Sequence, residues 1–255
     1  MNPKQRVLDD TQLAAFQRDG FVVVRGLYTA EETAEIARWT DEVAGSPELA
    51  GRDWKYYENS AADGTRILCR IENFVPFHEG FGRLITQRRM RQAVSELFGE
   101  EAVLFKDKIN FKLPGGDGFK AHQDVQAGWD AYATLHITAM VAIDETNAAN
   151  GSLEMIAGQH RQGILGEQWA PLSDAHTGHA AYQPVHCQPG DAVFFDSYAP
   201  HRSQPNRTDQ ARRVLYITYN RAAEGDHRAA YYADKHRNYP PDIERDPARD
   251  YRFKV

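Results

Sequence analysis

The sequence has 255 residues, of which 42% are hydrophobic and 26% charged, and its formal net charge is -6. This is an ordinary globular composition, and the length fits one large domain. The negative net charge argues against a nucleic-acid or acidic-membrane surface, because either would need a basic footprint. The two cysteines, Cys69 and Cys187, provide neither a disulfide framework nor a thiolate zinc site.

The N-terminal stretch MNPKQRVLDD lacks the apolar core of a signal peptide, and no apolar run approaches membrane-spanning length. We therefore expect a cytoplasmic protein. No internal repeat, low-complexity segment or Gly/Ser linker divides the chain. We expect one domain over residues 1–255, with a helical N-terminal part (1–100), a barrel core (101–220) and a C-terminal cover (221–255).

The first hundred residues are predicted to be mainly helical, with one early strand. Thr11 can cap a short helix that Gly20 ends, and FVVVRG directly after it is typical of a strand. Thr29 and Glu32 have the spacing of a capping box, which predicts the start of a second helix. A further helix is predicted from Phe81 to Phe98.

From Ala102 onward the sequence changes to short apolar segments separated by turns. The strand candidates are VLFKDKINFKL, ATLHITAMVAID, NGSLEMI, PVHC, AVFFD and RVLYITYN. Many short strands indicate a mainly β (α+β) fold, a jelly roll, with the N-terminal helices packed on one sheet. AAYYADKHR is expected to form a helical cover, because Tyr231, Tyr232 and Tyr239 need a surface on which to pack.

The segment KAHQDVQAGWD places His122 two residues before Asp124. On a strand, residues two apart point to the same face, so both side chains can reach one site. Non-haem Fe(II) oxygenases hold their metal with two imidazoles and one carboxylate, which leaves positions open for co-substrate and dioxygen. Such a site needs a second histidine from a late strand. His201, in DSYAPHRS, fits that requirement.

A second pair of residues distinguishes an Fe(II) oxygenase from a simple metal-binding site. An oxygenase of this type uses 2-oxoglutarate, whose far carboxylate needs a buried cationic partner. Arg212, eleven residues after His201, offers bidentate geometry at the start of a strand, and Ser203 can add a hydroxyl donor. Arg213 is expected to face the other way, because successive strand residues alternate.

Several spaced motifs together resemble the phytanoyl-CoA dioxygenase superfamily, whose members are Fe(II)/2-oxoglutarate oxygenases with a double-stranded β-helix. The resemblance extends from about residue 19 to residue 220. The motifs are His122-x-Asp124, Asn150-Gly151-Ser152-Leu153, Gly158-x-His160, Pro189-Gly190-Asp191, His201-x-Ser203-x-x-Asn206 and Arg212.

The resemblance implies a role for each matching residue. His122, Asp124 and His201 would bind Fe(II), while Arg212 and Ser203 would hold the distal carboxylate of 2-oxoglutarate. Two further co-substrate contacts are implied at Asn110 and Phe119. Members that halogenate carry a small residue in place of the carboxylate ligand, so Asp124 implies hydroxylation by O2.

Four blocks also resemble bacterial 2-aminoethylphosphonate dioxygenases: RIENFVPFHEGF, KDKINFKLPGG, FDSYAPHRS and YNRAAEGDHRAAYYADKHRNYPPD. This narrower resemblance implies a small polar substrate, hydroxylated at the carbon next to phosphorus. Polar residues within apolar blocks are the candidates for binding it. They are Arg70 and Lys108 for the phosphonate, Glu72, Asn73 and Trp129 for the amine, and Gln123 as a further contact.

Two other functions remain open at the level of sequence. One is a tailoring hydroxylase of another small molecule or natural product. The other is a non-catalytic or zinc-binding barrel that uses the same two histidines and aspartate. Arg212 with Ser203 argues against the zinc barrel, because a zinc hydrolase needs no clamp for a second carboxylate. We expect a small-molecule substrate and no nucleic-acid or membrane partner, and the sequence leaves the oligomeric state open.

Overall fold

The computed structural model describes residues 6–86 and 88–251 and contains two antiparallel sheets, as the predicted jelly roll requires. The larger sheet has seven strands in the order β1 (Phe21–Val24), β9 (Ala192–Asp196), β6 (His136–Ala142), β11 (Arg212–Arg221), β4 (Ala102–Lys112), β3 (Arg66–Glu72) and β2 (Trp54–Asn59). The smaller sheet has the order β5 (Phe119–His122), β10 (His201–Ser203), β7 (Leu153–Met155) and β8 (Gln183–Val185).

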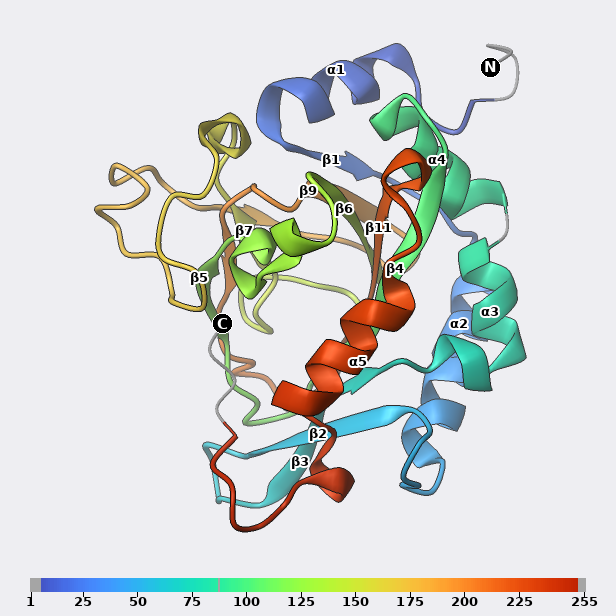
Figure 1. The fold of residues 1–255 in the computed structure, drawn as a ribbon, viewed down its shortest axis with the longest axis vertical. Coiled ribbons are helices and arrows are strands. Elements are labelled where there is room, and N and C mark those ends of the chain that lie inside the picture. Colours follow the sequence, from blue (N-terminus) through green and yellow to red (C-terminus); the bar gives the residue numbers. More distant parts are fainter. Residues whose placement is uncertain (1–5, 87, 252–255) are drawn as a thin grey trace.

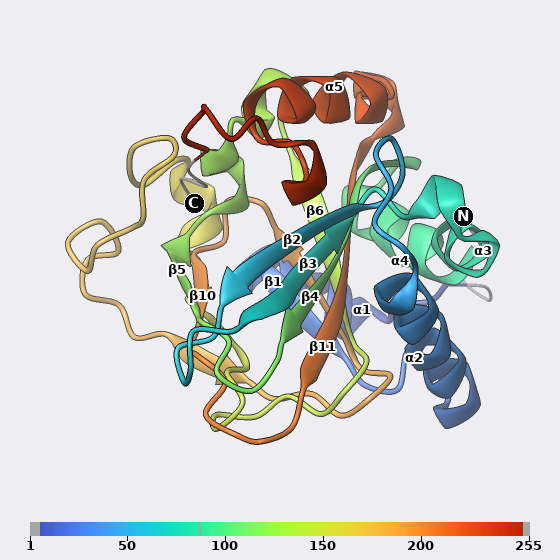
Figure 2. The same cartoon turned by 90° about the horizontal axis from the view of Figure 1, so that it is seen from below.

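Four N-terminal helices cover one face of the larger sheet, as Figures 1 and 2 show. They are α1 (Asp10–Asp19), α2 (Ala30–Gly45), α3 (Glu79–Thr86) and α4 (Arg88–Phe98). A fifth helix, α5 (Arg228–Asn238), lies apart from them, across β4 and near the β2–β3 hairpin. Short 3-10 turns occupy Val75–Phe77, Asp124–Ala127, Trp129–Ala131, Gln159–Gln162, Ala222–Glu224 and Asp242–Glu244. Within the described residues, no helix combines the length and apolarity needed to cross a bilayer.

The two faces of the larger sheet differ in chemistry because strand side chains alternate. Ile109 and Leu215 belong to the main core under the helices. Their neighbours Lys108 and Tyr216, which are paired across β4 and β11, point to the opposite face. The face turned away from the helices therefore carries a row of polar and charged side chains, and this row forms one wall of the site.

The predicted N-terminal helices are present, with two differences. The side chain of Asp9, not Thr11, caps α1: it accepts a hydrogen bond from the backbone of Gln12, whose side chain returns one. The capping box of Thr29 and Glu32 is confirmed. The helix predicted from Phe81 to Phe98 begins earlier, at Glu79, and its described residues form α3 and α4, on either side of residue 87.

The prediction that residues 1–100 are helical apart from one strand was wrong at β2 and β3. These strands form an antiparallel hairpin, and β3 extends the larger sheet by pairing with β4. Their alternating positions carry charged residues such as Arg70 and Glu72, which are buried by ion pairing instead of apolar packing. A search for apolar alternation misses strands of this kind.

The C-terminal helical cover is confirmed. Tyr231 and Tyr232 of α5 are buried in an aromatic cluster with Phe105 and Trp129. The hydroxyl of Tyr232 lies 3.1 Å from both the carbonyl and a carboxylate oxygen of Asp107 on β4. The helix is thereby attached to the same strand that contributes the polar row.

Candidate active site

His122, Asp124 and His201 converge at the edge of the smaller sheet. His122 is the last residue of β5 and His201 the first of β10, and the two are cross-strand partners. One carboxylate oxygen of Asp124 lies 3.9 Å from Nε2 of each histidine. The three potential ligand atoms lie within 4.8 Å of one another, close enough to hold one metal ion.

Backbone carbonyls determine which nitrogen of each histidine faces the site. Nδ1 of His122 lies 2.6 Å from the carbonyl oxygen of Lys120, and Nδ1 of His201 lies 2.9 Å from that of Ala199. A carbonyl oxygen can only accept, so both Nδ1 atoms carry a proton. Each Nε2 then presents its lone pair toward Asp124, as a metal-binding imidazole requires.

Asp124 reaches the histidines through a turn, not through the strand alternation expected from the sequence. Strand β5 ends at His122, and Asp124 begins the 3-10 turn Asp124–Ala127. Gln123 holds this turn: its amide nitrogen donates to two backbone carbonyls and its oxygen accepts from the backbone of Leu165. The side chain of Gln123, predicted as a substrate contact, is therefore occupied by backbone partners.

Burial and neighbouring charge give the three side chains the protonation states that a metal cation needs. Burial, assisted by His201, lowers the pKa of His122 to about 3, and burial also lowers the pKa of His201. The pKa of Asp124 is lowered as well, because the attraction of His201 and Lys108 outweighs the opposing effect of burial. At neutral pH the site offers two neutral imidazoles and one carboxylate, the donor set of a non-haem Fe(II) oxygenase.

Two buried cations, Arg212 and Lys112, are cross-strand partners on β11 and β4 of the larger sheet. Arg212 is 2% exposed, its Nη2 donates to the carbonyl of Gly151 at 2.7 Å, and its Nε has no hydrogen-bond partner. Lys112 is 1% exposed and donates to the hydroxyl of Ser203 at 2.8 Å. Across residues 6–86 and 88–251, neither cation forms an ion pair with a carboxylate.

Uncompensated burial of this kind is costly unless an anion binds. Burial lowers the pKa of Arg212, and burial together with Arg212 lowers the pKa of Lys112 to about 7. A carboxylate placed between them would relieve both effects. The two side chains therefore fit the distal carboxylate of 2-oxoglutarate.

Lys112 is absent from the sequence-based prediction of the site. The available signal was its alternation with Lys108 and Asn110 along one strand face. Asn110 is buried with its side-chain oxygen unpartnered, and the ring of Phe119 lies 5.7 Å from Nζ of Lys112. Arg213 faces the other way, as expected, and pairs with Asp144.

A pocket of about 390 Å³ lies between β5 and the β2–β3 hairpin and reaches the metal ligands at His122. Phe119 of β5, Lys112 of β4 and Arg70 of β3 are among its lining residues. Two of the proposed co-substrate residues, Phe119 and Lys112, thus share a single space next to His122 with the predicted substrate residue Arg70.

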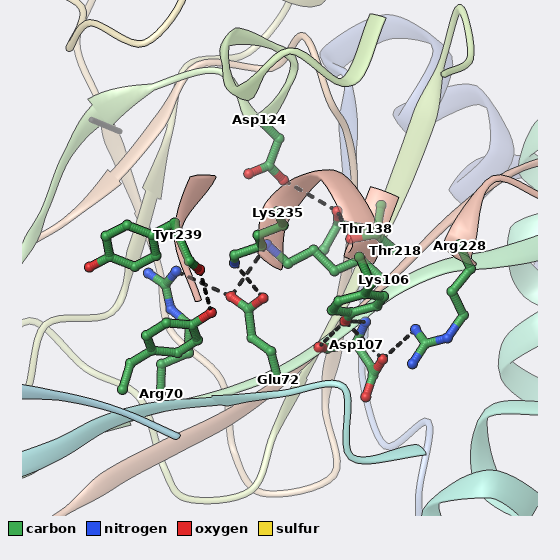
Figure 3. A network of polar contacts seen from close by, with 12 residues as sticks. Arg70, Glu72, Lys106, Asp107, Asp124, Thr138, Thr218, Arg228, Lys235 and Tyr239 are labelled. Atoms are coloured by element: carbon green, nitrogen blue, oxygen red, sulfur yellow. Dashed lines mark hydrogen bonds and ion pairs between the residues drawn. The ribbon is translucent and has the colours of Figure 1, made fainter. Parts of the chain in front are cut away.

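The predicted substrate residue Arg70 lines this pocket, and Glu72 lies beside it in the network drawn in Figure 3. Glu72 is fully buried and pairs with Arg70 at 3.2 Å, with Lys106 at 3.4 Å and with Lys235 at 2.5 Å. Three cations therefore surround the one carboxylate that the sequence suggested for binding an amine.

The other predicted substrate residues are spread around the same wall. Lys108 is half-buried, with its Nζ 4.7 Å from the centre of the Tyr216 ring. Trp129 is buried, and its indole nitrogen has no hydrogen-bond partner. Asn73 accepts a hydrogen bond from Arg228 at 2.8 Å, so its side-chain oxygen is already engaged.

The family model of phytanoyl-CoA dioxygenase (PhyH) matches residues 16–214. A 2-aminoethylphosphonate dioxygenase from Uncultured bacterium HF130_AEPn_1 is 40% identical over 248 residues, covering 94% of this chain and 92% of the relative. A methylphosphonate hydroxylase from Gimesia maris is 38% identical over 233 residues, covering 91% of this chain and 88% of the relative. The chain belongs to the phytanoyl-CoA dioxygenase family and is an Fe(II)- and 2-oxoglutarate-dependent dioxygenase.

Solved structures confirm the fold. EctD from S. alaskensis, in a crystal structure with 2-oxoglutarate and 5-hydroxyectoine, superposes with a TM-score of 0.75. The sequence identity is 21%, and the match covers 88% of this chain and 79% of EctD. The epimerase SnoN from nogalamycin biosynthesis, in complex with Fe3+, alpha ketoglutarate and nogalamycin RO, has a TM-score of 0.71 at 21% identity, covering 96% of this chain and 95% of SnoN.

Proposed function

We propose that this dioxygenase hydroxylates a small phosphonate at the carbon next to phosphorus, with 2-aminoethylphosphonate as the first candidate. The observation that carries the proposal is the convergence of His122, Asp124 and His201 beside a buried cationic wall. The two relatives near 40% identity, which are named for phosphonate substrates, support the substrate class. We place the reaction in the cytoplasm and in a single domain spanning residues 1–255.

In this proposal His122, Asp124 and His201 hold Fe(II) through two imidazole nitrogens and one carboxylate. Bound iron supplies the activation of O2, with 2-oxoglutarate as the source of electrons. Arg212, Lys112 and Ser203 bind the distal carboxylate of the co-substrate.

The protein positions one metal ligand through a short chain of hydroxyls. The hydroxyl of Thr138 donates to Asp124 at 3.3 Å and lies 2.9 Å from the hydroxyl of Thr218. These bonds fix the carboxylate relative to the larger sheet. Such positioning matters because a misplacement of about 1 Å at the reacting carbon can cost on the order of 100-fold in rate.

Arg70 and Lys108 are the proposed partners of the phosphonate oxygens. A binding partner for the amine of 2-aminoethylphosphonate has less support. Glu72 is surrounded by three cations, and the ring of Trp129 already lies 5.6 Å from the ammonium of Lys106. Methylphosphonate has no amine and is therefore the second candidate.

The test is succinate release by the iron-loaded enzyme with each phosphonate, together with mass detection of a product that has gained one oxygen atom. We expect at least one of the two phosphonates to stimulate succinate release and to be hydroxylated. Stimulation by other small molecules and by neither phosphonate would contradict the proposal and favour a tailoring hydroxylase. Arg70→Ala should raise the KM for the phosphonate and leave that for 2-oxoglutarate unchanged.

A further inference from the structure

We propose that Glu72 is a buried counter-ion that assembles Arg70, Lys106 and Lys235 into a receptor selective for doubly charged anions. The receptor makes helix α5 part of the substrate site. This inference rests on the proposed function and extends it from a substrate class to the residues that select a phosphonate by its charge.

The receptor is assembled from three separate elements. Glu72 and Arg70 lie two residues apart on β3, so they share a face, and Glu72 is the cross-strand partner of Lys108 on β4. Lys106 comes from the same face of β4, and Lys235 reaches in from α5. Figure 3 shows Glu72 beside Arg70 and Lys235 and below Asp124.

The charges in this group do not balance. Glu72 is one carboxylate among three basic side chains, so basic groups outnumber acidic ones in these four residues. Within the part of the chain that the structure describes, Lys106 pairs with no carboxylate other than Glu72, and the side chain of Lys108 forms no ion pair or hydrogen bond. A phosphonate dianion beside these residues would supply negative charge that Glu72 alone does not.

Glu72 is suited to hold the cations and not to bind the substrate itself. Its side chain is fully buried, and its pKa stays well below the usual range because Lys106, Lys235 and Arg70 outweigh the cost of burial. The pKa of Lys235 is held well below its usual value, first by burial and then by the neighbouring cations despite Glu72. A second anion beside the group would relieve this repulsion.

Arg70 lines the same pocket as Lys112, whereas Lys106 lies toward the other end of the β4–β11 ladder. Arg212 pairs with Lys112 at one end of the β4–β11 ladder, whereas Thr218 pairs with Lys106 six positions farther along. Six strand residues span about 20 Å. Asp124 is bonded to Thr138, the other cross-strand partner of Thr218, so it lies near the receptor end. In this proposal the phosphonate binds toward the Lys106 end, near Asp124, and the distal carboxylate of 2-oxoglutarate binds at the Arg212 end.

Charge selectivity can be measured with a pair of isosteres. A phosphonate above neutral pH and a sulfonate are both tetrahedral, but the phosphonate carries two charges and the sulfonate one. We expect the wild-type protein to bind 2-aminoethylphosphonate or methylphosphonate at least about 10-fold more tightly than the matching sulfonate. The titration is performed without oxygen, in the presence of Fe(II) and 2-oxoglutarate, so that no turnover occurs.

Two substitutions each remove one positive charge and keep a hydrogen-bond donor for Glu72. They are Lys235→Gln on α5 and Lys106→Gln on β4. Each should weaken phosphonate binding about 10- to 100-fold, change sulfonate binding little, and leave 2-oxoglutarate affinity unaltered. Lys235→Arg should keep the preference for the phosphonate over the sulfonate, because it retains the positive charge. The matched control is Arg237→Gln on the same helix, whose side chain is 69% exposed and pairs with Asp234; it should bind like wild type.

The inference and the proposed function fail in different ways. If the wild-type enzyme hydroxylates a phosphonate and both glutamine variants keep the full preference over the sulfonate, the receptor is overturned while the function stands. If the wild type binds phosphonates selectively, and the variants lose this preference, but no phosphonate is hydroxylated, the receptor stands and the proposed function fails. A wild type without any preference for the phosphonate overturns the receptor directly.

Discussion

At the scale of single residues, the site is shaped by charges that are buried without a full complement of partners. The imidazoles of His122 and His201 are kept neutral by burial and oriented by backbone carbonyls. On the co-substrate side, Arg212 and Lys112 are cations with no anionic partner among the described residues. A bound carboxylate would offset the desolvation cost of burying Arg212 and Lys112.

Arg212 should control affinity for the co-substrate. Arg212→Lys keeps a positive charge but loses the planar fork that binds a carboxylate with two parallel hydrogen bonds. We expect the KM for 2-oxoglutarate to rise about 10- to 100-fold, with iron binding unchanged. Arg213→Lys is the control, because Arg213 pairs with Asp144 on the opposite face. Equal effects of the two substitutions would contradict the assignment.

Asp196, at the end of β9, should make stability depend on pH. Burial raises its pKa to about 7, above the value in the unfolded chain. The folded state therefore favours the protonated carboxyl, and this stabilisation is lost as the pH rises toward about 7. Between about pH 5.5 and about pH 8, wild type should lose roughly 2 kcal/mol of unfolding free energy relative to Asp196→Asn. The free energy of unfolding of both proteins is measured by urea denaturation across this pH range. If it changes with pH in the same way in both, the prediction is wrong.

At the scale of elements, the co-substrate residues depend on the loop before β7. Gly151 has a φ of +77°, a conformation that other residues rarely adopt, and its carbonyl accepts the hydrogen bond from Arg212. A Cβ at this position would overlap the carbonyl oxygen of Gln204 and approach Nζ of Lys112 to 2.9 Å. The close packing at Gly151 thus determines the positions of the side chains of Arg212 and Lys112.

Gly151→Ala should therefore displace the co-substrate residues. We expect a rise of about 10-fold or more in the KM for 2-oxoglutarate, since one charged hydrogen bond is disturbed. The control is Gly99→Ala, which has a φ of +74° but open space around the added methyl group. Both variants carry backbone strain, so only a difference between their KM values, measured by succinate release, supports the role of Gly151. The same KM in both would contradict it.

Elements with a strong local signal were predictable from the sequence. Strand AVFFD and the capping box of Thr29 and Glu32 were recovered because apolar runs and cap spacings are local properties. The β2–β3 hairpin was missed because its buried face mixes aromatic residues with the charged Arg70 and Glu72, which hides the apolar alternation. Lys106, Lys112 and Lys235 were missed because a lysine in a sequence is most often solvated, and only its tertiary neighbours show that it is buried.

At the scale of the whole molecule, the larger sheet divides the protein into two chemically different halves. Helices α1 to α4 pack on its apolar face, and the polar face turns toward the metal ligands, the pocket and α5 (Figures 1 and 2). The jelly roll was predictable from the number and spacing of short strands. The ion pair between α5 and β3 was not predictable from the sequence, because residues 72 and 235 come together only in the folded chain.

The central claim is that His122, Asp124 and His201 bind one Fe(II) next to 2-oxoglutarate. The most direct measurement is anaerobic titration of the metal-free protein with Fe(II), followed by addition of 2-oxoglutarate. We expect equimolar iron binding and a weak visible charge-transfer band in wild type and in the exposed-histidine control His186→Ala. His201→Ala and Asp124→Ala should lose both signals. Iron binding and a band of wild-type strength in those two variants would contradict the account.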